Sequence, residues 1–400
     1  MNTATALPRA KIRLARWAQN SVPSNLQELL NLSVQPGLIS FSLGLPAPEL
    51  FPRHELAEKL SELLNDPCNL QYGPPLFSLR SQIVQIMARR GVVCSEDEVF
   101  VTTGAQQGIS LLVRLLVDHQ ASVLLEEQTY SGALQALESL APVIHAVPVD
   151  PQHGIDVDAL EGMLRKGLRP ALLYCIPEGH NPLSISMDRS AREKLVSLAE
   201  LYDFTILEDD PYGLLQYEES SLPALRSFAP ERVIYIGSFS KILAPGLRTG
   251  WVVASESLTR KLANLKEATD INCVNLNQRS ITAYLESGLL DTHLDLLKAT
   301  YRERRNTMGS ALRTCMAQAQ WTTPTSGVFF WVRLPKEIDS AQLLRLAVRE
   351  GVAFVPGCAF DAKTGPSQVR NCLRLNFSCC SNEDIREGIT RLGRLISCLN

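Results

Sequence analysis

The sequence predicts an α/β protein with a mostly parallel sheet covered by helices, followed by a smaller α+β domain. Two observations predict this fold. From residue 99 to about residue 290, short apolar runs typical of buried strands alternate with helical patterns, as in a parallel sheet covered by helices. Later in the chain, strand patterns such as GVFFWVRLP alternate with helices, up to the closing pattern EDIREGITRLGRLIS. A ligand is expected beyond the carboxyl ends of the parallel strands.

The composition is that of a globular chain and argues against several classes of protein. The 400 residues, 45% hydrophobic and 20% charged, are enough for two or three domains with well-filled cores. A formal net charge of −3 gives no electrostatic basis for binding nucleic acid or an anionic membrane surface. No apolar run approaches the length of a membrane span, and the N-terminal stretch lacks the apolar segment of a secretory signal.

The cysteines point to a reducing compartment. There are ten of them, scattered along the chain without any Cys-x-x-Cys spacing, so neither a zinc site nor a disulfide framework is predicted. Cys175, in the apolar run ALLYCIP, is expected to behave as a small hydrophobic residue. We therefore expect a cytoplasmic protein without a metal, a nucleic acid partner or a membrane partner.

The first hundred residues predict helices separated by turns. Leu26–Leu32 has helical periodicity, and the segment after it ends in a Gly/Pro-rich turn around Gly44. An amphipathic helix is expected from His54. The run YGPP, which begins at Tyr72, breaks the chain, and Leu76 restarts a helix.

The strand that begins at Val99 predicts an anion site at its end. It closes at Gly104, and Ala105 opens a helix whose free N–H groups and dipole favour a negative charge. Glycine allows close approach of a ligand, although the pattern occurs in many α/β proteins. The next strand, from Ser122, leads to Tyr130, which could stack on a flat ring or be a half-buried loop tyrosine.

An acidic cluster closes the strand Phe204–Leu207. It consists of Glu208, Asp209 and Asp210, with Tyr212 shortly after it. A partly buried carboxylate at a strand end could pair with a protonated ring nitrogen, and the alternative is an acidic loop cap.

The stretch GSFSKILAPGLRTGW carries one lysine, Lys241, between hydroxyls and close to Arg248. An amine at a strand end can condense with an aldehyde, while the guanidinium and the hydroxyls hold a phosphate. Pyridoxal 5′-phosphate (PLP) needs this combination. Taken alone, the motif could equally be a surface lysine in a strand–loop–strand connection.

This stretch resembles the signature of class I/II aminotransferases of PLP fold type I, in which the lysine forms a Schiff base with PLP. The resemblance covers nearly the whole chain. It implies catalytic roles for Lys241, Asp209 and Tyr130. Contacts with the phosphate are implied for Tyr72 from a neighbouring subunit and for Gly104, Ala105, Gln106, Ser238, Ser240 and Arg248. Contacts with the ring are implied for Tyr130 by stacking, for Asp209 at N1, and for Asn181 and Tyr212 at O3′. Contacts with the substrate are implied for Gly44, Asn181 and Arg374, whose guanidinium would clamp the carboxylate.

Several of these positions have plain alternatives. Tyr72 could be a loop tyrosine, and Arg374 could face outward from its strand. The chain also departs from the family pattern. Pro75 stands where relatives place a glycine, Ala105 replaces a hydroxyl residue, and the tetrad that begins at Asn181 reads Asn-Pro-Leu-Ser.

The resemblance implies an aminotransferase that moves an amino group between an L-amino acid and a 2-oxo acid, nearest to the 2-aminoadipate/kynurenine group. Gln27 replaces an arginine that meets acidic side chains in relatives, so a neutral, polar or aromatic partner is expected. A homodimer with shared sites is implied. The chain is expected to divide into three parts, residues 1–47, 48–290 and 291–400.

Two alternative functions stay open. One is a PLP enzyme of another outcome, such as a decarboxylase, a lyase or an oxygen-using deaminase. The other is a PLP-binding regulatory module.

Overall fold

The computed structural model describes residues 12–13, 15–19, 37–150, 152–218, 222–362 and 369–399. Its centre is a seven-stranded sheet with the order β2-β10-β9-β8-β7-β3-β4. The strands are β2 (Val99–Thr102), β10 (Gly250–Val253), β9 (Val233–Ser238), β8 (Thr205–Asp209), β7 (Leu172–Cys175), β3 (Ser122–Glu126) and β4 (Val143–Val147). Strand β10 is antiparallel to β2 and β9, and the other neighbours are parallel. The predicted mostly parallel sheet is confirmed.

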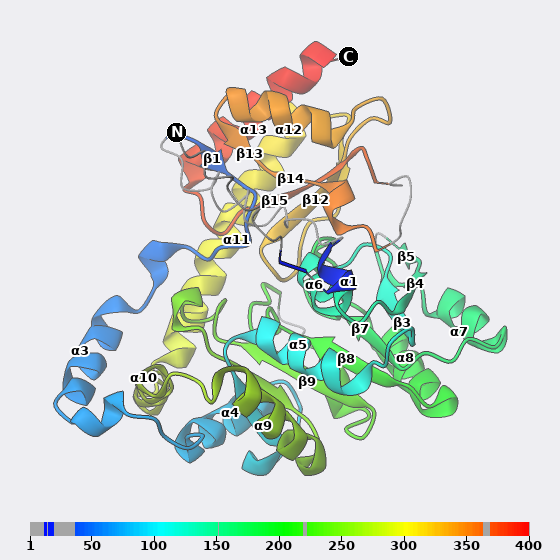
Figure 1. Ribbon diagram of the computed structural model, residues 1–400. Coiled ribbons are helices and arrows are strands. Elements are labelled where there is room, and N and C mark those ends of the chain that lie inside the picture. The colour runs from blue at the N-terminus through cyan, green and yellow to red at the C-terminus, as the bar shows by residue number, and fades with distance from the viewer. Residues whose placement is uncertain are drawn as a thin grey trace, which may run out of the picture.

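Helices cover both faces of this sheet (Figure 1). One face packs against α5 (Ala105–Leu116), α6 (Ser131–Glu138) and α9 (Glu256–Asp270). The other face packs against α4 (Phe77–Arg89) and α10 (Asn275–Glu286) at the β2 end, and α7 (Val157–Arg165) and α8 (Arg189–Tyr202) towards β4. Because both faces are covered, the central strands are buried on both sides and read as continuous apolar runs.

Helix α11 (Leu290–Cys315) leads into a second unit, drawn at the top of Figure 1. This unit contains a four-stranded antiparallel sheet with the order β11-β12-β15-β14. Its elements are β11 (Gln320–Trp321), β12 (Phe329–Arg333), α12 (Ser340–Arg349), β13 (Val352–Ala353), β14 (Val355–Pro356), β15 (Cys372–Asn376) and α13 (Asn382–Leu399). Strand β1 (Ile39–Ser40) pairs with β13 and so joins an N-terminal segment to this unit.

The remaining elements are short or peripheral. They are α1 (Arg16–Gln19), α3 (Arg53–Leu64), β5 (Val149–Asp150), β6 (Gly154–Ile155) and 3₁₀ turns at Pro48–Leu50, Pro67–Leu70, Glu96–Glu98, Leu225–Ser227, Pro245–Leu247 and Gly357–Phe360. The helix expected at Leu26–Leu32, with Gln27 in it, lies outside the described residues. Within the described ranges, no helix is long and apolar enough to cross a membrane.

Candidate active site

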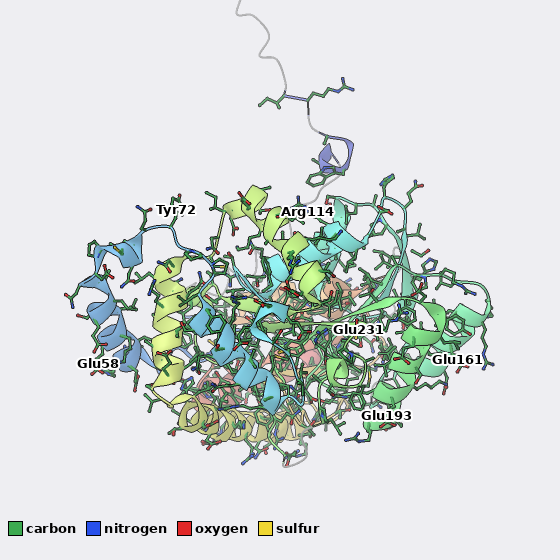
Figure 2. The ribbon with its side chains drawn as sticks, turned by 90° about the horizontal axis from the view of Figure 1, so that it is seen from below. Glu58, Tyr72, Arg114, Glu161, Glu193 and Glu231 are labelled. Atoms are coloured by element: carbon green, nitrogen blue, oxygen red, sulfur yellow. The ribbon has the colours of Figure 1, made fainter. Side chains whose placement is uncertain are left out.

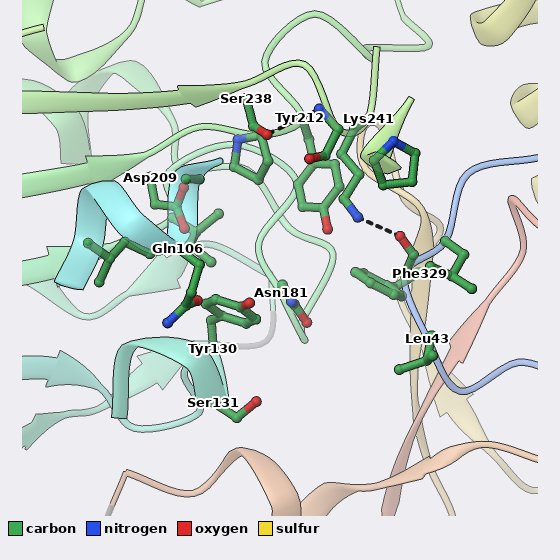
Figure 3. Close-up of a pocket in the computed structure, with 18 of the residues that line it drawn as sticks. Leu43, Gln106, Tyr130, Ser131, Asn181, Asp209, Tyr212, Ser238, Lys241 and Phe329 are labelled. Carbon is green, nitrogen blue, oxygen red and sulfur yellow. Dashed lines mark hydrogen bonds between the residues drawn. The ribbon is translucent and has the colours of Figure 1, made fainter. Parts of the chain in front are cut away.

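A cavity of about 590 Å³ opens where the parallel strands end (Figure 3). It lies at the carboxyl edge of the sheet, where the topology predicts a ligand. Most of the residues singled out from the sequence line it: Gly44, Ala105, Gln106, Tyr130, Asn181, Asp209, Tyr212, Ser238, Ser240, Lys241, Arg248 and Arg374. Gly104 and Tyr72 are not part of the lining.

Lys241 follows β9 and extends its side chain into the cavity. Its Nζ donates to the backbone oxygen of Gly44 at 2.6 Å, the bond drawn in Figure 3. Burial lowers the pKa of the Lys241 amine to about 8, and the positive charges of Arg374 and Arg248 contribute to this, whereas Asp209 opposes them. Roughly a tenth of this amine is therefore uncharged at pH 7, and an amine must be uncharged to act as a nucleophile.

Asp209 closes β8 and is 4% exposed. Tyr174, which no sequence pattern singled out, donates its hydroxyl to Oδ2 of Asp209 at 2.6 Å. The other oxygen, Oδ1, is buried and has no hydrogen-bond partner among the described residues. Burial raises the pKa of Asp209 to about 7, and the Tyr174 hydrogen bond works against that rise. The carboxylate thus carries one unused acceptor at the cavity wall.

The acids on either side of Asp209 serve different parts of the fold. Glu208 accepts the backbone N–H groups of residues 225 and 226 at 2.7 and 2.9 Å, and burial raises its pKa to about 7. Asp210 accepts from Nε of the buried Arg90 at 2.8 Å. All three side chains are buried, but only Glu208 caps a loop, the turn at 225–226, whereas Asp210 pairs with Arg90 and Asp209 lines the cavity.

The turn between β2 and α5 lies beside Arg248. Gly104 precedes the helix with φ +80°, and a Cβ there would lie 2.6 Å from Nη2 of Arg248. That nitrogen donates to the backbone oxygen of Thr103 at 3.3 Å. Because Gly104 has no side chain to cap α5, the first N–H groups of the helix stay open to an anion, and the guanidinium adds a positive charge.

The Tyr130 ring and the Gln106 side chain lie close to the backbone of Gly132 in α6. A Cβ on Gly132 would lie 2.4 Å from the Tyr130 ring and 2.3 Å from Oε1 of Gln106, and Nε2 of Gln106 donates to the backbone oxygen of Gly132 at 2.7 Å. Figure 3 shows Gln106 and Tyr130 together on one side of the cavity, across from Lys241. Burial raises the pKa of the Tyr130 phenol, so it stays protonated.

Arg374 faces the cavity, so the outward-facing alternative is wrong. It is 6% exposed, its Nη1 donates to Oδ1 of Asn181 at 2.6 Å, and its Nη2 donates to the backbone oxygen of Ser42. The rings of Phe329 and Phe360 lie 4.0 and 4.8 Å from its guanidinium carbon. Burial lowers the pKa of Arg374 to about 10, which leaves it charged near neutral pH. The residue is a fixed cation in reach of an anionic ligand.

The Asn181 turn is supported by a pair that the sequence did not reveal. The buried His180 donates from Nε2 to Oε2 of Glu126 at 2.9 Å, since its Nδ1 accepts the backbone N–H of Leu183 at 3.2 Å. His180 lies outside the cavity lining. It supports the loop that presents Asn181.

Tyr72 lies away from the cavity, and its side chain is exposed on the surface, with 79% of the residue accessible (Figure 2). Whether it enters another subunit's site stays a prediction. Across the described ranges, no group of three or more His, Cys, Asp or Glu side chains is placed to hold a metal ion.

Comparison with known proteins places the chain in one family. The model for "Aminotransferase class I and II" matches residues 40–392. The chain is 38% identical over 384 residues to an aromatic-amino-acid aminotransferase of Thermococcus litoralis, covering 93% of this chain and 91% of the relative. It is also 38% identical over 382 residues to a 2-aminoadipate transaminase of Thermus thermophilus, covering 93% of this chain and 94% of the relative.

The fold agrees. The structure of a kynurenine aminotransferase from Pyrococcus horikoshii, solved with PMP, superposes with a TM-score of 0.90 at 35% identity, covering 96% of each chain. Three features fit PLP, the cofactor of this family: the Asp209 oxygen that has no partner in the described part of the chain, the lowered pKa of Lys241 and the glycine turn beside Arg248. The chain therefore belongs to the class I and II aminotransferases and is a PLP-dependent aminotransferase of fold type I.

Proposed function

We propose that Lys241 is the amine that joins PLP and that Asp209 and Arg248 hold the two ends of the cofactor. The observation that carries this assignment is the presence, in one cavity, of a lysine of lowered pKa and a buried carboxylate oxygen without a partner among the described residues. The carboxylate oxygen calls for a donor, which a protonated pyridine nitrogen would supply. Arg248, Gly104 and the start of α5 form the anion site for the phosphate, with the Ser238 hydroxyl beside them.

PLP, when bound, supplies an aldehyde that condenses with amines and a ring that accepts the electrons of a broken Cα bond. The protein's own residues then divide the work between them. Arg374 binds and orients the substrate carboxylate as a bidentate partner. Once the substrate amine has replaced it on the cofactor, the freed Lys241 Nζ would take the proton from Cα and return it to C4′ of the cofactor, because this amine is neutral in part near pH 7. Asp209 provides the counter-charge, and Tyr130 with Asn181 and Tyr212 fixes the plane of the ring.

The reaction moves an amino group between an L-amino acid and a 2-oxo acid, and we propose that one partner carries a neutral side chain. Part of the cavity wall is apolar: Leu43, Leu45, Leu134, Val355 and Phe360. Ser131 and Gln135 are neutral polar residues of the same wall. The cations among the described lining residues are Lys241, Arg248 and Arg374, all assigned above, so no positive charge is left there for an acidic side chain.

Initial rates across a panel of amino donors test the substrate proposal. Aromatic and neutral polar amino acids should be the better donors in kcat/KM. A marked preference for 2-aminoadipate over neutral donors would contradict the interpretation of the cavity wall.

Selective reduction tests the assignment of Lys241. After incubation with PLP, borohydride should fix the cofactor on the peptide that contains Lys241, as shown by mass spectrometry. Lys266 is the control, because it is buried, whereas Lys241 is half-buried, and it donates to both carboxylate oxygens of Asp270 at 2.8 and 3.0 Å. Label on Lys266, or full turnover in Lys241→Ala, would refute the proposal.

A homodimer with shared sites is part of the proposal. Large apolar side chains are exposed on two neighbouring segments: Leu70, Tyr72, Phe77, Ile271 and Val274. Asn275 Nδ2 donates to the backbone oxygens of Asn69 and Gln71 at 3.4 and 3.3 Å and so ties these segments together. Such a patch suits a second copy of the chain.

Mixing two inactive variants tests the sharing of sites. Lys241→Ala and Tyr72→Ala protomers should regain activity on mixing, since one site of each mixed dimer then has both residues. A monomer in sedimentation, or no recovery after subunit exchange, would argue against sharing.

We also propose a division into residues 1–47, 48–290 and 291–400, and a cytosolic location. The pairing of β1 with β13 supports the assignment of the N-terminal part to the C-terminal unit. All ten cysteines are free thiols, which suits a reducing compartment. Limited proteolysis tests the division and should cut the chain near residue 290. A reporter fusion, followed in cells, tests the cytosolic location.

A further inference from the structure

We propose that Tyr174 is a positioning residue for Asp209: its hydroxyl fixes one carboxylate oxygen and keeps the group ionised, so that the other oxygen faces the cofactor ring. The inference rests on the proposed role of Asp209. It concerns a residue that lies behind the cavity and does not line it.

The pairing of two strands places the two side chains together. Strands β7 and β8 are parallel neighbours, and Tyr174 is opposite Leu207. Asp209 comes two residues after Leu207 and therefore points to the same face of the sheet as Tyr174. This is the face covered by α5 and α6, where Tyr174 packs with Leu207 and Ile109. The tyrosine reaches along the sheet to the end of β8.

The hydrogen bonding divides the carboxylate into a held oxygen and a free one. The Tyr174 hydroxyl, on a residue that is 1% exposed, donates to Oδ2 at 2.6 Å. Oδ1 receives no hydrogen bond from the described residues. A buried carboxylate with one oxygen fixed cannot rotate freely, so the second oxygen keeps one direction before any cofactor arrives.

The hydrogen bond from Tyr174 also offsets part of the free-energy cost of burying the negative charge of Asp209. Burial raises the pKa of Asp209 to about 7, and the hydrogen bond from Tyr174 lowers it. The other ionisable groups that interact electrostatically with Asp209 are Asp210, Lys241, Tyr130, Tyr212 and Cys175, whose own pKa burial raises so that it stays neutral. Asp210 raises the pKa of Asp209 and Lys241 lowers it, whereas both tyrosines stay protonated and neutral. Without Tyr174, Asp209 would be protonated over more of the neutral range.

Tyr174→Phe tests the inference in the cofactor-free protein. Carboxyl ¹³C NMR of protein labelled at aspartate, with Asp209→Asn to assign the signal, should show the Asp209 titration moving up by roughly one to two pH units. The affinity for PLP at pH 7 should fall about tenfold, because an upward shift of that size leaves only a small fraction of Asp209 ionised to pair with the ring. The loss should shrink as the pH rises, since Asp209 then ionises again.

Tyr235→Phe is the matched control. Tyr235 is also buried, sits on the neighbouring strand β9, and donates to Oδ2 of Asp210 at 3.0 Å. It makes the same kind of bond to the adjacent acid, so its removal should produce no upward shift at Asp209 and no pH-dependent loss of PLP. An unchanged Asp209 titration in Tyr174→Phe, or equal shifts in both variants, would overturn the inference. A wild-type protein that takes up no PLP would refute the proposed function, while the Asp209 titration would still decide the role of Tyr174.

Discussion

Replacing Gly104 by alanine should damage the candidate phosphate turn in two ways. The backbone there has φ +80° and ψ 163°, a region open to glycine and strained for other residues by about 1–3 kcal/mol. The added Cβ would also lie 2.6 Å from Nη2 and 3.1 Å from Cζ of Arg248. Because real Cβ atoms do not approach so closely, the guanidinium must move away from the turn.

The size of each effect follows from these contacts. The strain should lower the free energy of unfolding of the PLP-free protein by about 1–3 kcal/mol. The displaced guanidinium should lose a hydrogen bond to phosphate worth about 1.5–3 kcal/mol. That loss corresponds to PLP binding weakened by a factor of roughly 10 to 150.

Urea unfolding of the PLP-free protein measures the first effect, and equilibrium titration with PLP measures the second. Gly162→Ala is the control, because Gly162 lies inside α7 and no heavy atom lies within 4 Å of the point that an added Cβ would occupy. This change should stabilise the protein by about 0.5–1 kcal/mol and leave PLP affinity unchanged. A Gly104→Ala variant with wild-type PLP affinity would show that this turn and Arg248 do not hold the phosphate.

Three further predictions concern the loop after β7 and the lysine. Ser184→Gly should raise the free energy of unfolding, measured in urea titrations, by about 1 kcal/mol. Ser184 has φ +60°, which strains a residue with a side chain, and its buried hydroxyl has no hydrogen-bond partner in the described chain. A loss of stability in this variant would contradict the prediction. Arg192→Met should lower the free energy of unfolding by about 3–5 kcal/mol, because it strips the buried Glu178 of its charge partner at 2.8 Å; a change under about 1 kcal/mol would show the pair to be dispensable. The rate at which PLP joins Lys241, followed by visible absorbance, should rise with pH and level off above about 8, since only the neutral amine reacts; a rate already flat at pH 6 would count against a pKa of about 8.

Residues at strand ends were the part of the site open to prediction from sequence. Lys241, Asp209 and Tyr130 each follow a recognisable apolar run, and the carboxyl ends of parallel strands meet at one edge. The order of the elements therefore sufficed to expect them around one cavity, and the structure brings them there. Their chemical roles stay predictions until the experiments above are done.

Contacts that depend on the pairing of distant strands were not open to prediction. In the sequence, Tyr174 is a large residue within an apolar strand, with nothing to mark it as part of the site. Its hydrogen bond to Asp209 forms because β7 and β8 are neighbours and pair in one particular register. The orientation of Arg374 was ambiguous for the same reason, since alternation along β15 does not say which face is buried. Tyr72 is a different case, because its proposed role involves a second chain.

The three acids that end β8 also constrain how this strand can vary. Successive side chains of a strand point to opposite faces, so Glu208 and Asp210 look away from the cavity and Asp209 looks towards it. An insertion or deletion of one residue in β8 would turn Glu208 or Asp210, in place of Asp209, towards the proposed site of the PLP ring. It would also break the hydrogen bonds from Glu208 to the 225–226 turn and the ion pair of Asp210 with Arg90. Although three carboxylates lie together here, Glu208 and Asp210 cannot replace Asp209, because their side chains point away from the cavity.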